Sequence, residues 1–338
     1  EASNQVMPGL DSDMALYVKK YLQDKGISLF LEDSVKTIKE SDNASIILTE
    51  KGVELKTDLV LISAGVIPNV ELAKKAGVVL GKSGAIAVNT KMETSIPSIY
   101  AVGDCAEAFS LITGESIYRP MGSTANKMGR IAGDSMTGGN LEFRGILGTG
   151  ICQLFDLSIA QTGLSQREAK QMGLDVAVIH NIKPNQTEYF PGSSEMVIKA
   201  IADKKSGKLL GAQIVGKNGV DKRIDVIATA ITFGAKAEDL FHLDLAYAPP
   251  FATTKDPILY TGMILDNVIN HNRKIMTPEE LNVRLKHEEI IIIDVREKKD
   301  FDKGHIPTAS NIPLSSIREK ALSLDKNKTY LVHCNKGT

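Results

Sequence analysis

Apolar residues recur along the first half of the chain with two different periods, which predicts a mixture of helices and buried strands. Met14, Val18 and Leu22 are spaced as on one face of a helix. Asp11 precedes them as a helix cap, and Gly26 follows as a helix end. The other elements expected here are a short helix ending near Gly77, a helix over 123–136, and strands at 27–31, 45–48, 59–63 and 99–102, the last two buried.

From about residue 150 the pattern changes to that of antiparallel strands with fewer helices. Strands over 195–202 and 208–216 flank a Lys-Lys-Ser-Gly turn, which is typical of a hairpin. Three helices are expected with them: one over 221–233, one from Pro257 to about Asn270, and a short one whose capping box is Ser165 and Glu168.

A polar linker at 271–274 precedes a third, small α/β segment. Thr277 and Glu280 form a second capping box, with Pro278 at the first helical position. Apolar strands are expected over 290–294 and 330–333. The predicted organisation is therefore α/β and α+β in three parts, with boundaries at 1–149, 150–270 and 275–338.

Composition narrows the classes of function. Lys plus Arg number 40 against 41 Asp plus Glu, so there is no basic excess and we expect no nucleic-acid partner. No apolar run is long enough for a membrane span, and no membrane partner is expected. Three cysteines are too few for a disulfide scaffold or a metal cluster, so no metal is predicted and a cytoplasmic location is expected.

The ends of the chain and its glycines lead to a further expectation. The chain begins at Glu1 without an initiator methionine or a targeting segment, and it stops at Thr338, so we expect an internal fragment of a longer protein. The run 77–83 has three residues between its glycines, where a P-loop has four. No G-x-G-x-x-G follows a strand, so no complete dinucleotide-binding fingerprint is present.

The most specific motif is Thr94–Asp104, TSIPSIYAVGD. An apolar strand delivers Gly103 and Asp104 to its carboxyl end, where ligands bind in open α/β sheets. A Gly-Asp pair alone is more often an ordinary turn. The whole string, however, resembles the second flavin-binding motif of the two-dinucleotide-binding flavoprotein disulfide reductases, which implies that Asp104 holds the ribityl chain of FAD. The resemblance also implies that the helix start at Ser123, Thr124 and Ala125 faces the flavin pyrimidine, where its dipole favours negative charge.

The first residues of the chain resemble the NADH domain of the same family. Glu1–Met7 matches the end of that domain's second strand, which implies that Glu1 accepts hydrogen bonds from the adenine ribose of NADH. A terminal glutamate without a role is the alternative. On this interpretation both glycine-rich loops and the redox cysteine lie upstream of Glu1.

The middle segment resembles the dimerisation domain of coenzyme A-disulfide reductases and of their NADH oxidase and peroxidase relatives. The matching stretches are Tyr189–Gly192, Val220–Asp225 and Leu245–Phe251. The resemblance implies a homodimer in which Tyr189 and Tyr247 approach the partner's redox sulfur, where a phenol can donate a hydrogen bond. It implies that Lys255 and Asn126 contact coenzyme A, although some members have His in place of Asn126. On chemistry alone, a tyrosine beside Pro-Pro is more often a packing residue.

The last segment resembles a rhodanese domain. The ordered matches are Asp294–Glu297, Phe301, Gly304–Pro307, Asn311–Pro313 and the loop Cys334–Thr338. The resemblance implies that Cys334 is a thiolate nucleophile for sulfane sulfur, cradled by successive amides. Thr308 stands where the family usually has glycine, and the closing residues of the loop would lie beyond Thr338. The other cysteines, Cys105 and Cys152, are interpreted as packing residues.

Taken together, the resemblances imply an FAD- and NADH-dependent reductase of coenzyme A persulfide, polysulfide or coenzyme A disulfide, coupled to a sulfur-transferring rhodanese domain. Its expected partners are a second copy of the chain, coenzyme A thiols or persulfides, and sulfane-sulfur donors. Two alternatives remain open: an NADH oxidase or peroxidase of the same fold, and a non-catalytic dimerisation and sulfur-carrier fragment.

Overall fold

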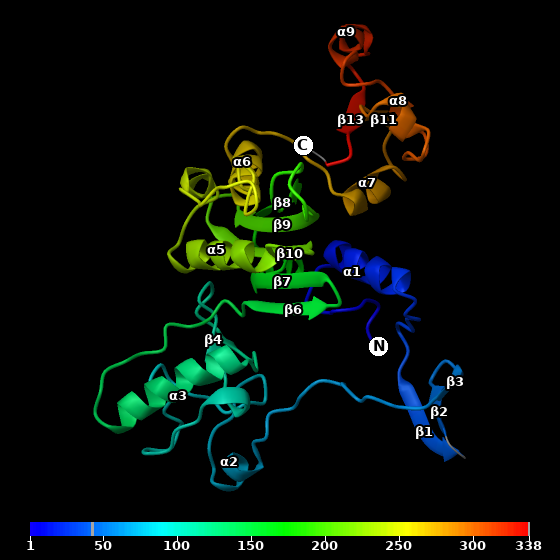
Figure 1. The fold of residues 1–338 in the computed structure, drawn as a ribbon. Helices are drawn as coiled ribbons and strands as arrows, with labels where there is room; N and C mark the ends of the chain where they lie inside the picture. Colours follow the sequence, from blue (N-terminus) through cyan, green and yellow to red (C-terminus); the bar gives the residue numbers. More distant parts are fainter. Residues whose placement is uncertain (42–43, 337–338) are drawn as a thin grey trace. The chain divides into compact units, whose positions relative to one another are not determined.

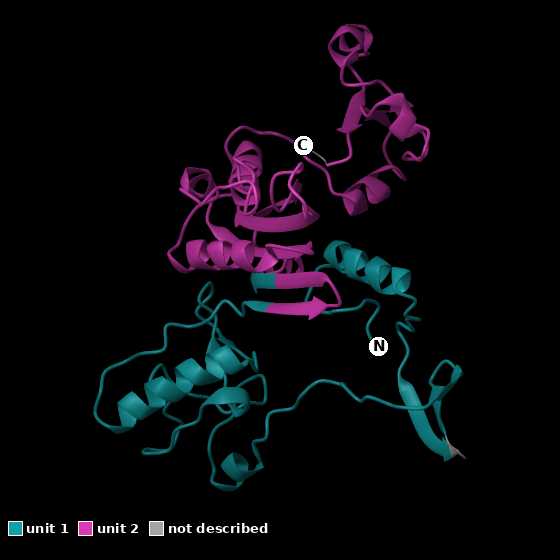
Figure 2. Cartoon of the chain, viewed as in Figure 1, with its two compact units in different colours: residues 1–150, 161–163 teal, residues 151–160, 164–338 magenta. Residues whose placement is uncertain are grey.

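The computed structural model describes residues 1–41 and 44–336 (Figure 1). The chain forms two compact units, one of residues 1–150 and 161–163 and the other of 151–160 and 164–338 (Figure 2). Both units combine helices with strands, which confirms the predicted mixed α/β class. None of the helices among the described residues is long and apolar enough to cross a membrane.

The first unit opens with α1 (Ser12–Asp24), which buries Met14 and Val18 as the periodicity predicted. Asp11 occupies the N-cap position, but its side chain makes no capping hydrogen bond. An antiparallel sheet follows, of β1 (Val35–Ser41), β2 (Ala44–Thr49) and β3 (Glu54–Thr57). The expected strand at 45–48 is therefore confirmed as β2.

Two predicted strands of this unit do not form. Residues 27–31 and 59–63 have no regular secondary structure, and Leu59 and Leu61 are 82% and 88% exposed. A buried strand needs hydrogen-bonded neighbours and elements that cover its faces. Among the described residues neither run pairs with another strand, so apolar composition alone was not enough.

The strand predicted at 99–102 is reduced to a single bridge. Tyr100 pairs with Glu93, and Ala101 is buried, but no regular ladder continues from them. The chain then turns at Gly103 into the short 3₁₀ helix η1 (Gly103–Cys105). The turn at Gly103 that was expected after the strand is therefore present, but the residues before it do not form a strand of a sheet.

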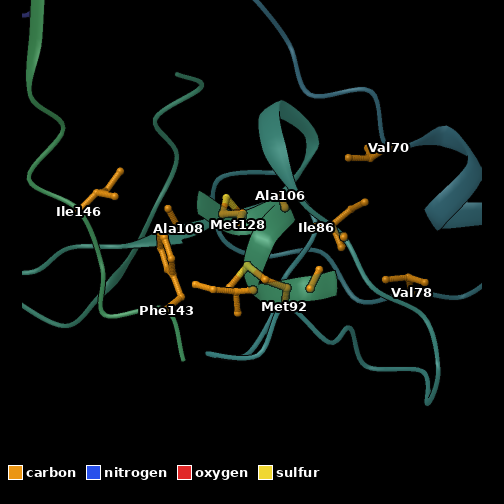
Figure 3. Packing of buried hydrophobic residues seen from close by; sticks show 12 residues of the cluster. Val70, Val78, Ile86, Met92, Ala106, Ala108, Met128, Phe143 and Ile146 are labelled. Atoms are coloured by element: carbon orange, nitrogen blue, oxygen red, sulfur yellow. The ribbon is translucent and has the colours of Figure 1, made fainter. Parts of the chain in front are cut away.

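The core of the first unit is a cluster of twelve buried residues, shown in Figure 3, that includes Met92, Met128 and Phe143. It gathers side chains from α3 (Gly122–Met136), as expected from the helical pattern over 123–136, and from the segments around it. The other elements of this part are α2 (Glu71–Lys75), β4 (Ala108–Phe109) and β5 (Ser116–Ile117).

The second unit is built on a five-stranded sheet in the order β6-β7-β10-β9-β8. The strands are β6 (Gly150–Leu154), β7 (Leu157–Gly163), β8 (Val176–Pro184), β9 (Glu195–Asp203) and β10 (Leu209–Gly216). The predicted hairpin is confirmed: β9 pairs antiparallel with β10, and Ala200 lies opposite Ala212. Almost every residue of these two strands is buried, because they lie in the interior of the sheet.

Helices cover this sheet. The long α5 (Val220–Thr232) packs on β10, and α6 (Pro257–Ile269) packs on β8 (Figure 1). The short α4 (Gln166–Gln171) starts at the predicted capping box of Ser165 and Glu168, with both of its reciprocal hydrogen bonds present. The 3₁₀ helix η2 (Glu238–His242) packs against α6.

The C-terminal part of the second unit holds a separate three-stranded parallel sheet in the order β12-β11-β13. Its strands are β11 (Ile290–Asp294), β12 (Ser310–Asn311) and β13 (Thr329–His333). Its helices are α7 (Pro278–Arg284), α8 (Lys298–Phe301), α9 (Ile317–Lys320) and the 3₁₀ helix η3 (Ala321–Ser323). The capping box of Thr277 and Glu280 and both predicted strands are confirmed.

Candidate functional site

In the first unit, Gly103 brings the predicted flavin motif against the start of α3. Its φ of +76° lies in the left-handed region, and a Cβ added there would stand 3.5 Å from the Cβ of Ala125. The following residue, Asp104, is exposed, and its backbone carbonyl accepts a hydrogen bond of 2.9 Å from the Tyr118 hydroxyl. Partial burial, and after it the charge of Asp104, raises the pKa of the Tyr118 phenol. No sequence signal had singled out Tyr118.

The start of α3 presents backbone N–H groups without a side-chain cap. Its N-cap residue, Met121, makes no side-chain hydrogen bond, and the first turn holds no acidic residue. Ser123 and Asn126 are exposed there, whereas Thr124 is buried. Because such a helix end favours negative charge, the exposed carboxylate of Asp104 and this helix start together fit a ligand that offers hydroxyl groups and an electronegative edge. Those are the features of the flavin and its ribityl chain.

Glu1 lies beside the segment that follows α1. Its carboxylate accepts hydrogen bonds from the backbone N–H and the hydroxyl of Ser3, at 2.9 and 2.7 Å. These bonds, the backbone one first, lower the pKa of the Glu1 carboxyl. Its α-ammonium group donates to the carbonyl of Phe30. An ionised, exposed carboxylate is chemically able to accept from ribose hydroxyls.

In the second unit, the loops that carry the two predicted tyrosines are tied together by Arg223. Its side chain is buried and pairs with Asp256 at 2.7 Å. It also donates to the backbone carbonyls of Asn185 and Phe251, at 2.8 and 3.4 Å. Sequence reasoning noted the Asp-Lys-Arg run but assigned no role to the arginine. Its role could not be read from the sequence, because the partners in the two loops and Asp256 lie 28 to 38 residues away.

Tyr189 and Tyr247 extend from these fixed loops into solvent. Their side chains are 78% and 48% exposed. The two loops meet where the N–H of Thr187 donates to the carbonyl of Pro249, at 3.3 Å. A cavity of about 350 Å³ lies beside them, lined by Asn185, Gln186, Asn218, Gly219, Lys222, Arg223, Ala246, Pro250 and Phe251.

The predicted rhodanese motifs converge on one buried carboxylate. Asp294 is fully buried, and Arg296 grips it with hydrogen bonds of 2.6 to 3.0 Å. The hydrogen bond from this guanidinium holds the pKa of Asp294 below its ordinary value. Arg296 also donates to the Gly304 carbonyl, and Asn311 donates to the carbonyls of Asp294 and Arg296. Asp294, Arg296, Gly304 and Asn311 thus form one hydrogen-bond network. A hydrogen bond of 3.4 Å from Arg296 to the side-chain oxygen of Asn335 joins this network to the Cys334 loop.

Cys334 directly follows β13, and the backbone N–H of Lys336 donates to its Sγ at 3.4 Å. One amide of the predicted cradle is therefore in place. Gly337 and Thr338, the rest of the predicted loop, lie outside the described residues. Thr308, which stands where the resemblance to rhodanese domains places glycine, adopts a φ of +73°, in the left-handed region that glycine enters without strain.

The other two cysteines differ from each other. Cys105 is half-buried against the core of the first unit, in keeping with its interpretation as a packing residue. Cys152 is exposed, so its interpretation as a packing residue was wrong: β6 is the edge strand of its sheet, and most of its side chains are left uncovered. Within the described part of the chain, no group of three or more His, Cys, Asp or Glu residues is placed to hold a metal ion.

Comparison with protein families agrees with this geometry. The profile described as "Pyridine nucleotide-disulphide oxidoreductase" matches residues 1–127, and that of the family's dimerisation domain matches residues 150–257. The chain belongs to the pyridine nucleotide-disulphide oxidoreductases. A rhodanese-like domain matches residues 277–338. Membership of this family implies FAD and NAD(P)H as cofactors.

Individual proteins and solved structures are also similar to this chain. The chain is 41% identical over 239 residues to "NAD(P)H sulfur oxidoreductase (CoA-dependent)" of Pyrococcus furiosus, over 71% of this chain and 54% of that protein. Among solved structures, reduced Bacillus anthracis CoADR-RHD has a TM-score of 0.94 and 35% identity, over 99% of this chain and 60% of that one. A NAD-dependent persulfide reductase from A. fulgidus has a TM-score of 0.89 and 36% identity, over 99% and 61%. The chain thus spans little more than half the length of these relatives.

Proposed function

We propose that the protein reduces coenzyme A persulfide, polysulfide or coenzyme A disulfide with NADH and FAD, and that Cys334 transfers sulfur to or from that reaction. The observation that carries the proposal is the Cys334 loop with its Asp294–Arg296 network, on the same chain as a flavoprotein dimerisation domain. The printed names of the relatives, which include CoA-dependent sulfur oxidoreductase and persulfide reductase, support it.

The cofactor-binding residues are all assigned to the first unit. Asp104 accepts hydrogen bonds from the ribityl hydroxyls, and Gly103 keeps the approach open. The first turn of α3, at Ser123, Thr124 and Ala125, provides the dipole for the flavin pyrimidine. When bound, FAD supplies the two-electron relay between pyridine nucleotide and sulfur. Glu1 accepts from the adenine ribose of NADH.

The residues that contact the sulfur centre and coenzyme A are assigned to the second unit, except for Asn126, which belongs to the first. Tyr189 and Tyr247 donate hydrogen bonds to the partner subunit's redox sulfur, which requires them to be exposed on fixed loops, as they are. Lys255 and Asn126 contact coenzyme A. The overall reaction is balanced as coenzyme A persulfide plus NADH and a proton giving coenzyme A, hydrogen sulfide and NAD⁺. One sulfur–sulfur bond is broken by the two electrons of the hydride.

The test is a comparison of substrates on the full-length, FAD-loaded protein. NADH consumption is followed with coenzyme A persulfide, coenzyme A disulfide and hydrogen peroxide side by side. The proposal expects the sulfur substrates to be reduced fastest. A faster rate with hydrogen peroxide would instead identify a peroxidase, and rapid NADH consumption in air without an added substrate would identify an oxidase. Flavin absorbance of the purified 338-residue chain tests the other alternative, because a colourless product would favour a sulfur-carrier module.

Cys334→Ser, with Cys152→Ser as the matched control, tests the role of the rhodanese domain. A serine hydroxyl stays protonated near neutral pH and is a poor sulfur nucleophile, so sulfur transfer from thiosulfate to cyanide should be lost in the first variant only. Reduction of the flavin by NADH should be equal in both. Retained transfer in Cys334→Ser would place the sulfur carrier elsewhere.

A further inference from the structure

The Cys334 loop is attached to the dimerisation domain by Lys336. The Nζ of Lys336 lies 3.1 Å from Oε1 of Glu188 and 3.0 Å from Oε1 of Glu195. Glu188 lies in the loop between β8 and β9, and Glu195 is the first residue of β9. The backbone N–H of the same lysine donates to the sulfur of Cys334. One residue therefore contacts both the sulfur and two carboxylates of the neighbouring domain.

Two further lysines lie on the same side of this domain. Lys183 is opposite Met196 in the pairing of β8 with β9, directly beside Glu195, which contacts Lys336. The Nζ atoms of Lys183, on β8, and Lys255 lie 4.2 and 5.1 Å from the centre of the Tyr260 ring on α6. An aromatic face holds ammonium groups through its negative quadrupole, so Tyr260 keeps the two positive charges close together. Burial first, and then the charge of Lys336, lowers the pKa of Lys183, whereas a negative charge on Cys334 raises it.

We propose that Lys336 docks the Cys334 loop on Glu188 and Glu195, and that this docking completes a cationic site in which Lys183 and Lys255 stabilise the anionic sulfur of Cys334. The ligand is the sulfur anion itself, first as thiolate and then as persulfide. The proposal depends on the proposed function only for the identity of Cys334 as the sulfur carrier.

The chemistry explains why a cationic site is useful here. The Cys334 thiolate attacks the outer sulfur of a persulfide donor, a new sulfur–sulfur bond forms, the donor's own sulfur–sulfur bond breaks, and the donor leaves as a thiolate. Donor, nucleophile and product are all anions, so neighbouring ammonium groups reduce the repulsion at every stage. Lys336 thereby acts as a positioning residue, and Lys183 and Lys255 act as charge-stabilising residues for Cys334.

The first test measures the ionisation of Cys334 in the full-length, FAD-loaded protein. The rate of alkylation by iodoacetamide is followed against pH by peptide mass spectrometry, with Cys105 and Cys152 as references in the same sample. Lys336 donates to the sulfur, and Lys183 and Arg296 interact with it electrostatically. The other charged and titratable groups around them are Lys255, Glu188, Glu195, Asp294 and His333. Lys183→Gln and Lys255→Gln should each raise the apparent pKa of Cys334 by about half a unit to one unit.

The matched control for those variants is Lys204→Gln. Lys204 lies in the β9–β10 turn and pairs with Asp175 on the surface of the same domain. It should leave the pKa of Cys334 unchanged. Unchanged values in both Lys183→Gln and Lys255→Gln would overturn the cationic site.

The second test reverses the charges of the docking contact. Lys336→Glu should raise the pKa of Cys334 at least as much as the loss of both other lysines, because the loop leaves its site while its backbone N–H is retained. Adding Glu188→Lys and Glu195→Lys should restore the original value, since the attraction returns with opposite signs. Failure of this rescue in a folded triple variant would overturn the docking. If the triple variant does not fold, Lys336→Gln must still raise the pKa of Cys334 for the docking to stand.

These readouts separate this inference from the proposed function. Shifted Cys334 ionisation in a protein that reduces no sulfur substrate would leave the docking standing and remove the proposed reaction. Normal reduction of coenzyme A persulfide, with the pKa of Cys334 unchanged in every variant, would support the proposed reaction and overturn the docking.

Discussion

At the scale of single residues, the buried guanidinium of Arg223 holds the loops of Tyr189 and Tyr247 in place. It faces Asp256, which is 3% exposed and also accepts a hydrogen bond of 3.0 Å from the N–H of Ile258 at the start of α6. Removing one partner of a buried ion pair leaves the other charge unpaired, which costs more than the pair itself contributes. The two residues should therefore be strongly coupled.

We expect Arg223→Met to lower the free energy of unfolding by about 3–5 kcal/mol. Asp256→Asn, which keeps an oxygen for the helix cap, should cost a similar amount. The double variant should cost clearly less than the sum, because no charge remains unpaired. Urea denaturation followed by circular dichroism measures all three. Strictly additive losses would show that the pair does not act as a unit.

The free energy of unfolding should depend on pH through the ionisation of Asp294. Arg296 holds the pKa of this carboxyl below its ordinary value of 3.8. A carboxyl whose pKa is lower in the folded state contributes stability above the unfolded value, and this contribution is lost as the pH falls through the folded value. We therefore expect Asp294→Asn to be less stable than the parent at pH 7, and the difference to shrink below about pH 4.

Urea midpoints between pH 3 and pH 7 measure this effect. Asp302→Asn is the matched control, because Asp302 pairs with Lys298 at the surface of the same small domain. Such surface pairs contribute little, so the control should follow the parent at every pH. A constant difference between Asp294→Asn and the parent over the whole range would contradict the linkage.

At the scale of elements, the contact between η1 and α3 is what makes the proposed flavin site. The backbone at Gly103 turns through a left-handed conformation, which places Asp104 beside an uncapped helix start. The proposed flavin site needs both η1 and α3, because the Asp104 carboxylate on η1 and the dipole of α3 must act on the same flavin.

We expect Asp104→Ala to lower the affinity for FAD in the full-length protein. Charge-assisted hydrogen bonds to hydroxyl groups contribute about 1.5–3 kcal/mol, which corresponds to a weakening of roughly ten- to a hundredfold. Flavin absorbance after extensive dialysis is the measurement. Glu142→Ala, at an exposed acidic residue of the same unit, should keep its flavin. Full flavin retention in Asp104→Ala would remove this residue from the site.

At the scale of the whole molecule, the second unit exposes three aromatic side chains on two loops that contact each other. Tyr189, Tyr247 and Phe251 are 78%, 48% and 68% exposed on adjacent loops. Exposed apolar surface of this kind marks an interaction site. The matched dimerisation domain covers the same loops, which favours a second copy of the chain as the partner.

We expect a dimer by light scattering at micromolar concentration. Permanent dimers of this kind bury about 2,000 Å² or more, so one central charge should weaken the dimer strongly. Phe251→Glu should therefore shift the mass towards the monomer. Leu322→Glu, at a side chain 86% exposed in the rhodanese segment, should leave the mass unchanged. A monomeric parent protein would contradict the prediction directly.

The sequence by itself determined the features whose causes are local. Capping boxes at Ser165 and Thr277 were predictable because both partners lie three residues apart, and the hairpin of β9 and β10 because its turn is contiguous. The run 59–63 was mispredicted because a buried strand depends on neighbours that its own residues do not specify.

Tertiary structure alone decided which distant groups meet. The ordered rhodanese motifs indicated a site at Cys334, but not that Arg296 and Asn311 would form a network around the buried carboxylate of Asp294. Lys336 and Glu188 are 148 residues apart, and Arg223 and Asp256 are 33 apart. No local pattern encodes such pairs, because their proximity follows from how the strands and loops between them pack. The motifs in the sequence therefore indicate which residues are chemically active, whereas the arrangement of charges around Cys334 is set only by the folded structure.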